Sequence, residues 1–170
     1  KLISEMEMKL YTSLYGVDTV TLRYFNVYSP CQNAEGPYAT AVANFMEFIR
    51  QGKNPFITGD GEQRRDMAHL EDVVSANLSA MARGPNFGGT AYDIGTGDNI
   101  SLNEIREIVQ EHFPDVVFDY QNERVGDVLT TKAQIQPFLS ESSWVPKHNI
   151  DQGIRECFEK LKAELGGAGE

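Results

Sequence analysis

Residues 57–74 read ITGDGEQRRDMAHLEDVV, and this stretch decides the fold class. The apolar and β-branched residues of NPFIT at 54–58 predict a short strand, and the glycine-rich GDGEQ at 59–63 predicts a turn. RDMAHL at 65–70 predicts a second strand. It leads into a predicted helix whose apolar residues recur at helical spacing: Val73, Val74, Leu78 and Met81. Strand, turn, strand and helix in one short stretch predict a mixed α/β domain.

Strands and helices alternate on both sides of this stretch. TVTLRYF at 19–25, TAYDI at 90–94 and VVFDY at 116–120 have the β-branched and aromatic content of strands. Ser101 and Glu104 have the spacing of a capping box, in which both side chains satisfy backbone N–H groups at a helix start. The alternation favours a layered α/β fold. Further helices are predicted at residues 2–14, 37–49, 132–139 and 154–165.

Composition argues against several classes of function. A formal net charge of −10 argues against a nucleic-acid partner, because backbone binding depends on clustered lysine and arginine. No apolar run reaches the roughly 20 residues of a membrane span, so no membrane partner is predicted. Cys31 and Cys157 lack CxxC or Cys/His spacing. The three histidines are scattered, and no metal site is predicted. A cytoplasmic protein follows.

Two glycine-rich turns are candidates for phosphate loops. IGTGDNIS at 94–101 lies between a predicted strand and a predicted helix, but Ile100 fills its third glycine position, which favours a structural turn. GDGEQR at 59–64 lacks the Gly-Lys-Ser/Thr ending of a P-loop. Arginines are stronger candidates, because a planar guanidinium binds two oxygens of a diphosphate at once. Four arginines are candidates, and each of them could instead form an ordinary surface ion pair: Arg23, Arg64, Arg65 and Arg124.

Four blocks of sequence lie in one order: RYFNVYSP at 23–30, ITGDGEQRRDMAHLEDVV at 57–74, YDIGTGDNISLNEI at 92–105 and RVGD at 124–127. In this order and spacing they resemble the NAD-dependent epimerase/dehydratase family of extended short-chain dehydrogenase/reductases. Their details are most similar to UDP-glucose and UDP-N-acetylglucosamine 4-epimerases. The resemblance implies the carboxyl-terminal part of that fold, with the end of a Rossmann-like sheet and a small mixed α/β substrate-binding domain.

The resemblance also implies a division of the chain. Residues 1–30 correspond to a remnant of the Rossmann-type domain, and residues 31–170 to the nucleotide-sugar-binding region, some of which packs back on the first part. KLISE at 1–5 places Lys1 at the lysine of the family's catalytic Tyr-x-x-x-Lys pair, where it also contacts the cofactor. The tyrosine and the glycine-rich NAD loop would precede residue 1. Without the resemblance, Lys1 is simply a charged terminal residue.

The remaining site residues are carried over by motif position. Tyr24 and Phe25 match the strand that passes the nicotinamide end of NAD. Arg65 and Arg124 match the two arginines that hold the diphosphate, and Asp127 matches an acid that lies near the ribose or orients an arginine. Asn26 matches the residue that contacts the sugar or a phosphate. Phe56 and Thr58 match residues that line the uracil pocket. A turn-forming role is the alternative for Asn26.

These matches imply the substrate-binding part of a UDP-hexose 4-epimerase, which acts through a 4-keto intermediate and is catalytically incomplete as this chain alone. NAD is expected in the complete enzyme and not on the chain by itself. A homodimer through the opening helix is also implied. Two alternatives stay open: a non-catalytic nucleotide-sugar-binding module, and the same part of a 4,6-dehydratase or decarboxylase. Asp66 and Asp72 are expected to be structural, as an ion-pair partner and a helix N-cap.

Overall fold

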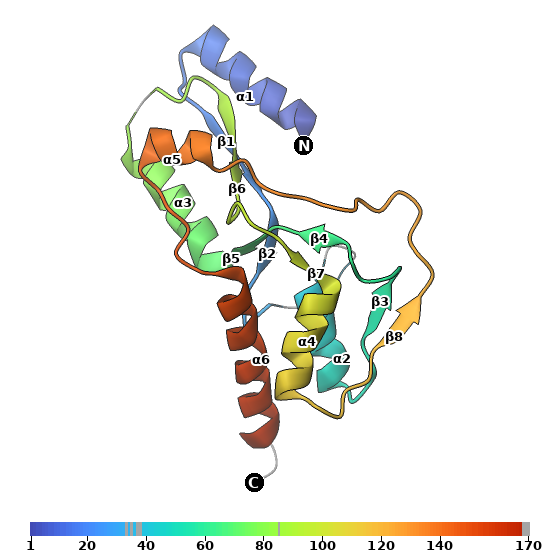
Figure 1. The fold of residues 1–170 in the computed structure, drawn as a ribbon. Helices are drawn as coiled ribbons and strands as arrows, with labels where there is room; N and C mark the ends of the chain where they lie inside the picture. The colour runs from blue at the N-terminus through green and yellow to red at the C-terminus, as the bar shows by residue number, and fades with distance from the viewer. Residues whose placement is uncertain (33, 35, 37–38, 85, 168–170) are drawn as a thin grey trace.

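The computed structural model describes residues 1–167 except 33, 35, 37, 38 and 85 (Figure 1). It has the mixed α/β architecture predicted from the alternation of segments. The elements follow in the order α1 (Leu2–Tyr15), β1 (Val20–Tyr24), β2 (Asn26–Tyr28), α2 (Ala41–Arg50), β3 (Phe56–Thr58), β4 (Arg64–Arg65), β5 (Met67–His69), α3 (Leu70–Ala82), β6 (Thr90–Ile94), β7 (Ile100–Ser101), α4 (Leu102–His112), β8 (Asp119–Gln121), α5 (Gln136–Ser142) and α6 (Ile150–Gly167).

Short strand pairs bring distant parts of the chain together. β1 pairs in parallel with β6, and β2, which follows directly, pairs in parallel with β5. β3 pairs in parallel with β8, while β4 and β7 are antiparallel. Asn26 therefore lies opposite Met67, one residue after the Arg65-Asp66 step. The first and second predicted blocks of sequence meet at this point.

Two hydrophobic clusters lie on either side of these strands. One contains the buried faces of α2, α4 and α6, which run beside one another at one end of the molecule (Figure 1). The other contains residues of α3, α5 and β6, with β1 packed against it. The two clusters meet at β2 and β5, because Tyr28 and Met67 belong to the first and Ala68 to the second. None of the helices in the described part of the chain is long and apolar enough to cross a membrane.

Local sequence signals predicted some boundaries well and missed others. The capping box is confirmed: Ser101 Oγ accepts a hydrogen bond from Glu104 N at 3.1 Å, and Glu104 Oε2 accepts one from Ser101 N at 2.7 Å. The helix expected to begin at Pro37 starts at Ala41 after its N-cap, Thr40, and Pro37 itself lies outside the described residues. The segment predicted near 132–139 forms its helix later, at α5.

The prediction that Asp72 caps a helix is wrong. His69 is the N-cap of α3, with its Nδ1 accepting a hydrogen bond from Glu71 N at 3.3 Å. The buried carboxylate of Asp72 instead accepts hydrogen bonds from Lys147 N at 2.9 Å and His148 N at 3.0 Å. Asp72 thus holds the segment before α6 against the start of α3, a contact that local sequence does not reveal.

The prediction that Asp66 is an ion-pair partner is also wrong. This carboxylate is fully buried and accepts hydrogen bonds from Thr96 N at 2.9 Å, Thr96 Oγ1 at 3.0 Å, Gly97 N at 3.0 Å and Ala133 N at 2.9 Å. A Cβ on Gly95 would lie 2.8 Å from its Oδ1, so only glycine fits there. Asp66 therefore fixes the 95–97 loop and the segment at residue 133 against β4 and β5.

Replacing Asp66 with alanine should destabilise the fold strongly. The substitution leaves buried N–H groups of Thr96, Gly97 and Ala133 without an acceptor, which we expect to lower the free energy of unfolding by about 3 kcal/mol or more. Urea unfolding followed by circular dichroism measures this change. The control is Asp115→Ala, an exposed acid, which should change stability by less than about 0.5 kcal/mol. Equal effects of the two substitutions would contradict the role of Asp66.

Candidate functional site

A pocket of about 250 Å³ lies where the start of α2, β3, β4 and the segment at 124–127 meet. Its walls come from parts of the chain that are far apart in sequence. All six residues predicted to contact substrate line it: Asn26, Phe56, Thr58, Arg65, Arg124 and Asp127. All four sequence blocks thus converge on one cavity, because the third contributes Leu102 to its lining and also supports it through the hydrogen bond from Thr96 to Asp66.

Arg65 is held firmly at the wall of this pocket. Its Nη2 donates to Asp127 Oδ1 at 2.6 Å, and its Nη1 donates to the backbone oxygen of Arg64 at 2.9 Å. The side chains of Arg65 and Asp127 retain 20% and 30% of their exposure, so the pair is partly shielded and still reachable from the cavity. The carboxylate fixes the orientation of the guanidinium, whose remaining N–H groups can bind an anion.

The RVGD block forms a tight turn that presents a second guanidinium. Asp127 N donates to Arg124 O at 3.1 Å, and Gly126 has a φ of 81°. A positive φ at the third turn position is typical of a type II turn and favours glycine. The turn therefore places Arg124 at its exposed start and returns Asp127 to Arg65. Two guanidinium groups from separate segments line the same cavity.

Aromatic side chains also line the pocket. The rings of Phe48 and Phe56 meet edge to face, with centroids 5.5 Å apart and an interplanar angle of 86°. Thr58 lines the pocket as well, and its backbone oxygen accepts a hydrogen bond from Gln63 Nε2 at 2.7 Å. Asn26 is fixed by its Nδ2, which donates to Asp66 O at 2.9 Å. Guanidinium groups and aromatic rings in one cavity suit a ligand that combines an anionic group with a flat ring.

Sequence reasoning missed several residues of this pocket. Asn44 and Phe48 lie one helical turn apart on α2, and Thr40 is both the N-cap of this helix and part of the pocket. Both lie off the buried stripe of the helix, and the apolar ring of Phe48 at such a position was the available signal. The other lining residues that were missed are Ala39, Ala41, Phe45, Gln63 and Leu102.

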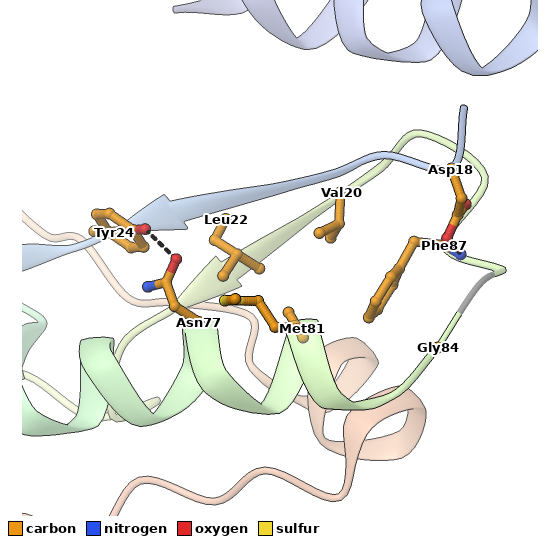
Figure 2. Close-up of a pocket in the computed structure, with 9 residues that line it drawn as sticks. Asp18, Val20, Leu22, Tyr24, Asn77, Met81, Gly84 and Phe87 are labelled. Atoms are coloured by element: carbon orange, nitrogen blue, oxygen red, sulfur yellow. Dashed lines mark hydrogen bonds between the residues drawn. The ribbon is translucent and has the colours of Figure 1, made fainter. Parts of the chain in front are cut away.

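The three residues expected near the cofactor lie outside this pocket. Lys1 is exposed at the start of α1. Tyr24 lines a separate groove of about 460 Å³ between β1 and α3, where its hydroxyl donates to Asn77 Oδ1 at 3.0 Å (Figure 2). Phe25 is half-buried between β1 and β2, and its N–H donates to Ile94 O at 2.9 Å. The structure does not join these residues to the pocket that Arg65 lines.

The IGTGDNIS loop does not fit the phosphates of a dinucleotide. The backbone N–H groups of Thr96 and Gly97, which a phosphate would require, donate to the buried carboxylate of Asp66. Gly97 has a φ of 75°, and a Cβ there would lie 3.0 Å from Ile135 Cδ1. The interpretation of this loop as a structural turn is therefore confirmed, and its glycines serve packing.

Arg23 and Arg64, the other two arginine candidates, are engaged elsewhere. Arg23 pairs with Glu5 of α1 at 2.6 Å and with Asp93 of β6 at 3.5 Å. Arg64 points away from the pocket and pairs with Glu104 at 2.8 Å. Of the four arginines that the sequence offered, Arg65 and Arg124 are those that line the cavity.

Two of the histidines, which the sequence leaves scattered, come together. The rings of His69 and His148 stack with centroids 4.0 Å apart, and the ligand atoms of His69, His148 and Glu71 lie within 4.8 Å of one another. However, the lone pair of His69 Nδ1 already accepts a hydrogen bond from Glu71 N. Because the rings stack, their in-plane lone pairs do not converge on a point, and we assign no metal to this cluster.

Comparison with known proteins gives the family. The model of the NAD dependent epimerase/dehydratase family matches residues 1–95, more than half of the chain. The chain belongs to this family. It is 30% identical over 161 residues to UDP-glucose 4-epimerase of Mycolicibacterium smegmatis, covering 94% of this chain and 50% of that protein.

Solved structures of family members have the same fold. The structure of UDP-glucose 4-epimerase from Thermotoga maritima with UDP-glucose matches with a TM-score of 0.86 and 33% identity, over 97% of this chain and 52% of that one. UDP-N-acetylglucosamine 4-epimerase from Methanobrevibacter ruminantium, in complex with UDP-N-acetylmuramic acid, matches with a TM-score of 0.82 and 30% identity, over 94% and 51%. This family member therefore spans about half the length of the relatives it matches.

The surroundings of His69 should make the free energy of unfolding depend on pH. Burial lowers the pKa of His69 from its ordinary 6.5, and the neighbouring His148 lowers it further, against the opposing effect of the nearby acids Glu71, Asp72 and Glu156. The imidazole of His69 therefore binds a proton more readily in the unfolded chain than in the folded chain. We expect the free energy of unfolding to be fully retained above about pH 6.5 and to fall as the pH drops below it.

Denaturant unfolding between pH 5 and pH 8 measures this loss of stability. His69→Asn keeps a capping side chain and removes the titrating group, so the decrease below pH 6.5 should become smaller in this variant. An unchanged pH dependence in His69→Asn would show that another group causes the decrease.

Proposed function

We propose that this chain is the substrate-binding part of an NAD-dependent nucleotide-sugar epimerase and that its pocket holds a UDP-sugar. The observation that carries this proposal is that Arg65 and Arg124, from separate segments, line the same cavity as the aromatic pair of Phe48 and Phe56. A diphosphate needs planar, two-pronged donors, and a nucleobase needs a flat apolar surface. The order of the sequence blocks supports the carboxyl-terminal half of the family domain.

Each of the six predicted site residues has a proposed role. Arg65 and Arg124 bind the diphosphate oxygens, and Asp127 orients Arg65 through their 2.6 Å ion pair. Phe56 and Thr58 contact the uracil. The exposed Asn26 contacts the sugar or a phosphate. The chain carries a net charge of −10, so binding of this anion depends on these local donors and not on the overall field.

Catalysis would require the remainder of the family domain. The loop at 94–101 does not fit the phosphates of NAD, so we propose that the cofactor is held mainly by that remainder. Lys1, Tyr24 and Phe25 are our candidates for contacts to it from this chain. Within the described residues β1 pairs only with β6, and its other edge is the proposed place where the sheet continues. The 4-epimerase reaction itself is likewise a proposal.

Helix α1 is the proposed homodimer contact. No residue of this helix is buried, and several of its apolar side chains face solvent: Leu2, Ile3, Met6, Leu10 and Leu14. Large exposed apolar surface of this kind is typical of protein contacts. Arg23 ties the helix to β1 through its ion pair with Glu5, so the surface keeps a fixed position on the molecule.

Substituting either pocket arginine should weaken nucleotide binding. We expect the chain to bind UDP and UDP-sugars, and Arg65→Ala or Arg124→Ala to raise the Kd about 10- to 100-fold, because each removes a charge-assisted contact to the diphosphate. Isothermal titration calorimetry at fixed salt measures this. Arg50→Ala, which removes an exposed arginine of α2 that pairs with Glu47 and Glu164, is the matched control and should leave the Kd unchanged.

Two outcomes of the same titration would contradict parts of the proposal. NAD binding by the chain, comparable to that of UDP, would contradict the assignment of the cofactor to the rest of the domain. Absence of UDP and UDP-sugar binding by folded wild-type protein would contradict the substrate site and leave only membership of the family.

A further inference from the structure

We propose that Arg64 is a positioning residue for the diphosphate site, because it fixes the two segments that carry Arg65 and Arg124. The inference rests on the proposed function. Successive residues of a strand point to opposite sides, so β4 directs Arg65 into the pocket and Arg64 away from it. The neighbouring arginines therefore have different tasks.

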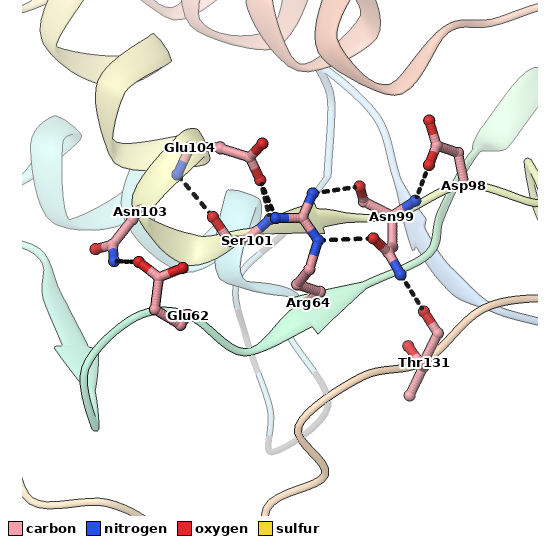
Figure 3. A network of polar contacts seen from close by, with 8 residues as sticks. All are labelled: Glu62, Arg64, Asp98, Asn99, Ser101, Asn103, Glu104 and Thr131. Atoms are coloured by element: carbon pink, nitrogen blue, oxygen red, sulfur yellow. Dashed lines mark hydrogen bonds and ion pairs between the residues drawn. The ribbon is translucent and has the colours of Figure 1, made fainter.

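All three guanidinium nitrogens of Arg64 have protein acceptors (Figure 3). Its Nε donates to Asn99 Oδ1 at 2.7 Å, its Nη2 donates to Asn99 O at 3.0 Å, and its Nη1 lies 2.8 Å from Glu104 Oε2. Every nitrogen of the guanidinium has a partner. These contacts hold β4 against the segment at 99–104.

The acceptors are themselves fixed. Glu104 belongs to the capping box of α4 with Ser101, which pairs with Arg64 across β4 and β7. Asn99 Nδ2 donates to Thr131 O at 3.4 Å, linking the network to the segment that follows the RVGD turn (Figure 3). The side chain of Arg64 is thus joined to a rigid helix start on one side and to this segment on the other.

The backbone of Arg64 joins the same parts. Its N–H donates to Leu129 O at 2.8 Å, and its carbonyl oxygen accepts from Thr131 N at 3.0 Å. That carbonyl oxygen also accepts the hydrogen bond from Arg65 Nη1 at 2.9 Å. The segment at 129–131 is only a few residues from Arg124. Arg64 therefore sets the spacing between the two guanidinium groups that the proposed diphosphate bridges.

Removing the Arg64 guanidinium should leave Arg65 and Arg124 in place but less well ordered. Arg64→Met keeps the length of the side chain and its backbone hydrogen bonds, while Glu104 and Asn99 lose their partner. Binding of the diphosphate must then order the two arginine side chains, and their loss of conformational entropy weakens binding. We expect the Kd for UDP to rise about 5- to 10-fold, an effect that depends on Arg65 still being present.

A double-mutant cycle tests this dependence. The Kd for UDP is measured by calorimetry for wild type, Arg64→Met, Arg65→Ala and the double variant, with thermal unfolding to confirm that each is folded. Positioning predicts that Arg64→Met weakens binding less than about 2-fold when Arg65 is already alanine. A general structural role predicts the same fold-change in both backgrounds, and that result would overturn the inference.

Two further variants keep the test decisive. Arg155→Met removes a half-buried arginine whose ion-pair partners are Asp151 and Glu111 and not residues of β4, and it should leave the Kd unchanged. Arg64→Lys replaces the variant if Arg64→Met is unfolded, and should show a smaller loss with the same dependence on Arg65. If the wild-type protein binds UDP, Arg65→Ala weakens this binding and Arg64→Met leaves the Kd unchanged, this inference alone would be overturned. Wild type that does not bind UDP would overturn the proposed function, and this inference with it.

Discussion

The buried carboxylate of Asp66 is the interaction on which the rest of the site depends. It gathers hydrogen bonds from the loop at 96–97 and from residue 133, so it holds three distant segments around one point. A buried charge is tolerated only when such donors satisfy it. Its own backbone oxygen accepts from Asn26, and its neighbour Arg65 enters the pocket. The adjacent residues Arg65 and Asp66 therefore link the proposed ligand site to the core.

Residues 64–66 are consecutive, but their side chains lie in three different environments. Arg64 enters a polar network, Arg65 lines the cavity, and Asp66 is buried in the interior. The alternation of a strand separates the first two, and the pairing of β5 with β2 encloses the third. An acidic chain can in this way concentrate positive charge at one cavity without a basic surface. The same arrangement explains why neighbouring charged residues are not interchangeable here.

Local signals in the sequence predicted much of the fold, and the motifs predicted most of the site. The capping box needed only Ser101 and Glu104, which interact within one turn of helix, and it formed as predicted. The six substrate residues line one cavity because their motifs lie on strands and turns that the pairing brings together. Their roles, and those of Lys1, Tyr24 and Phe25, stay predictions.

The misses have a common cause, because they involve partners far away in sequence. Asp66 accepts from Thr96, 30 residues later, and Asp72 from His148, 76 residues later, so neither role could be read from neighbours. The stacking of His69 on His148 has the same origin. The contribution of Asn44 and Phe48 to the pocket depends on how α2 approaches β3, which helical periodicity does not determine.

A crystal structure of the chain with UDP tests the central claim most directly, namely that one cavity of this chain recognises a nucleoside diphosphate. The account predicts the diphosphate between the guanidinium groups of Arg65 and Arg124, with the uracil beside Phe56. Nucleotide bound instead in the groove beside Tyr24 and Asn77, or contacts to neither arginine at saturating UDP, would contradict it.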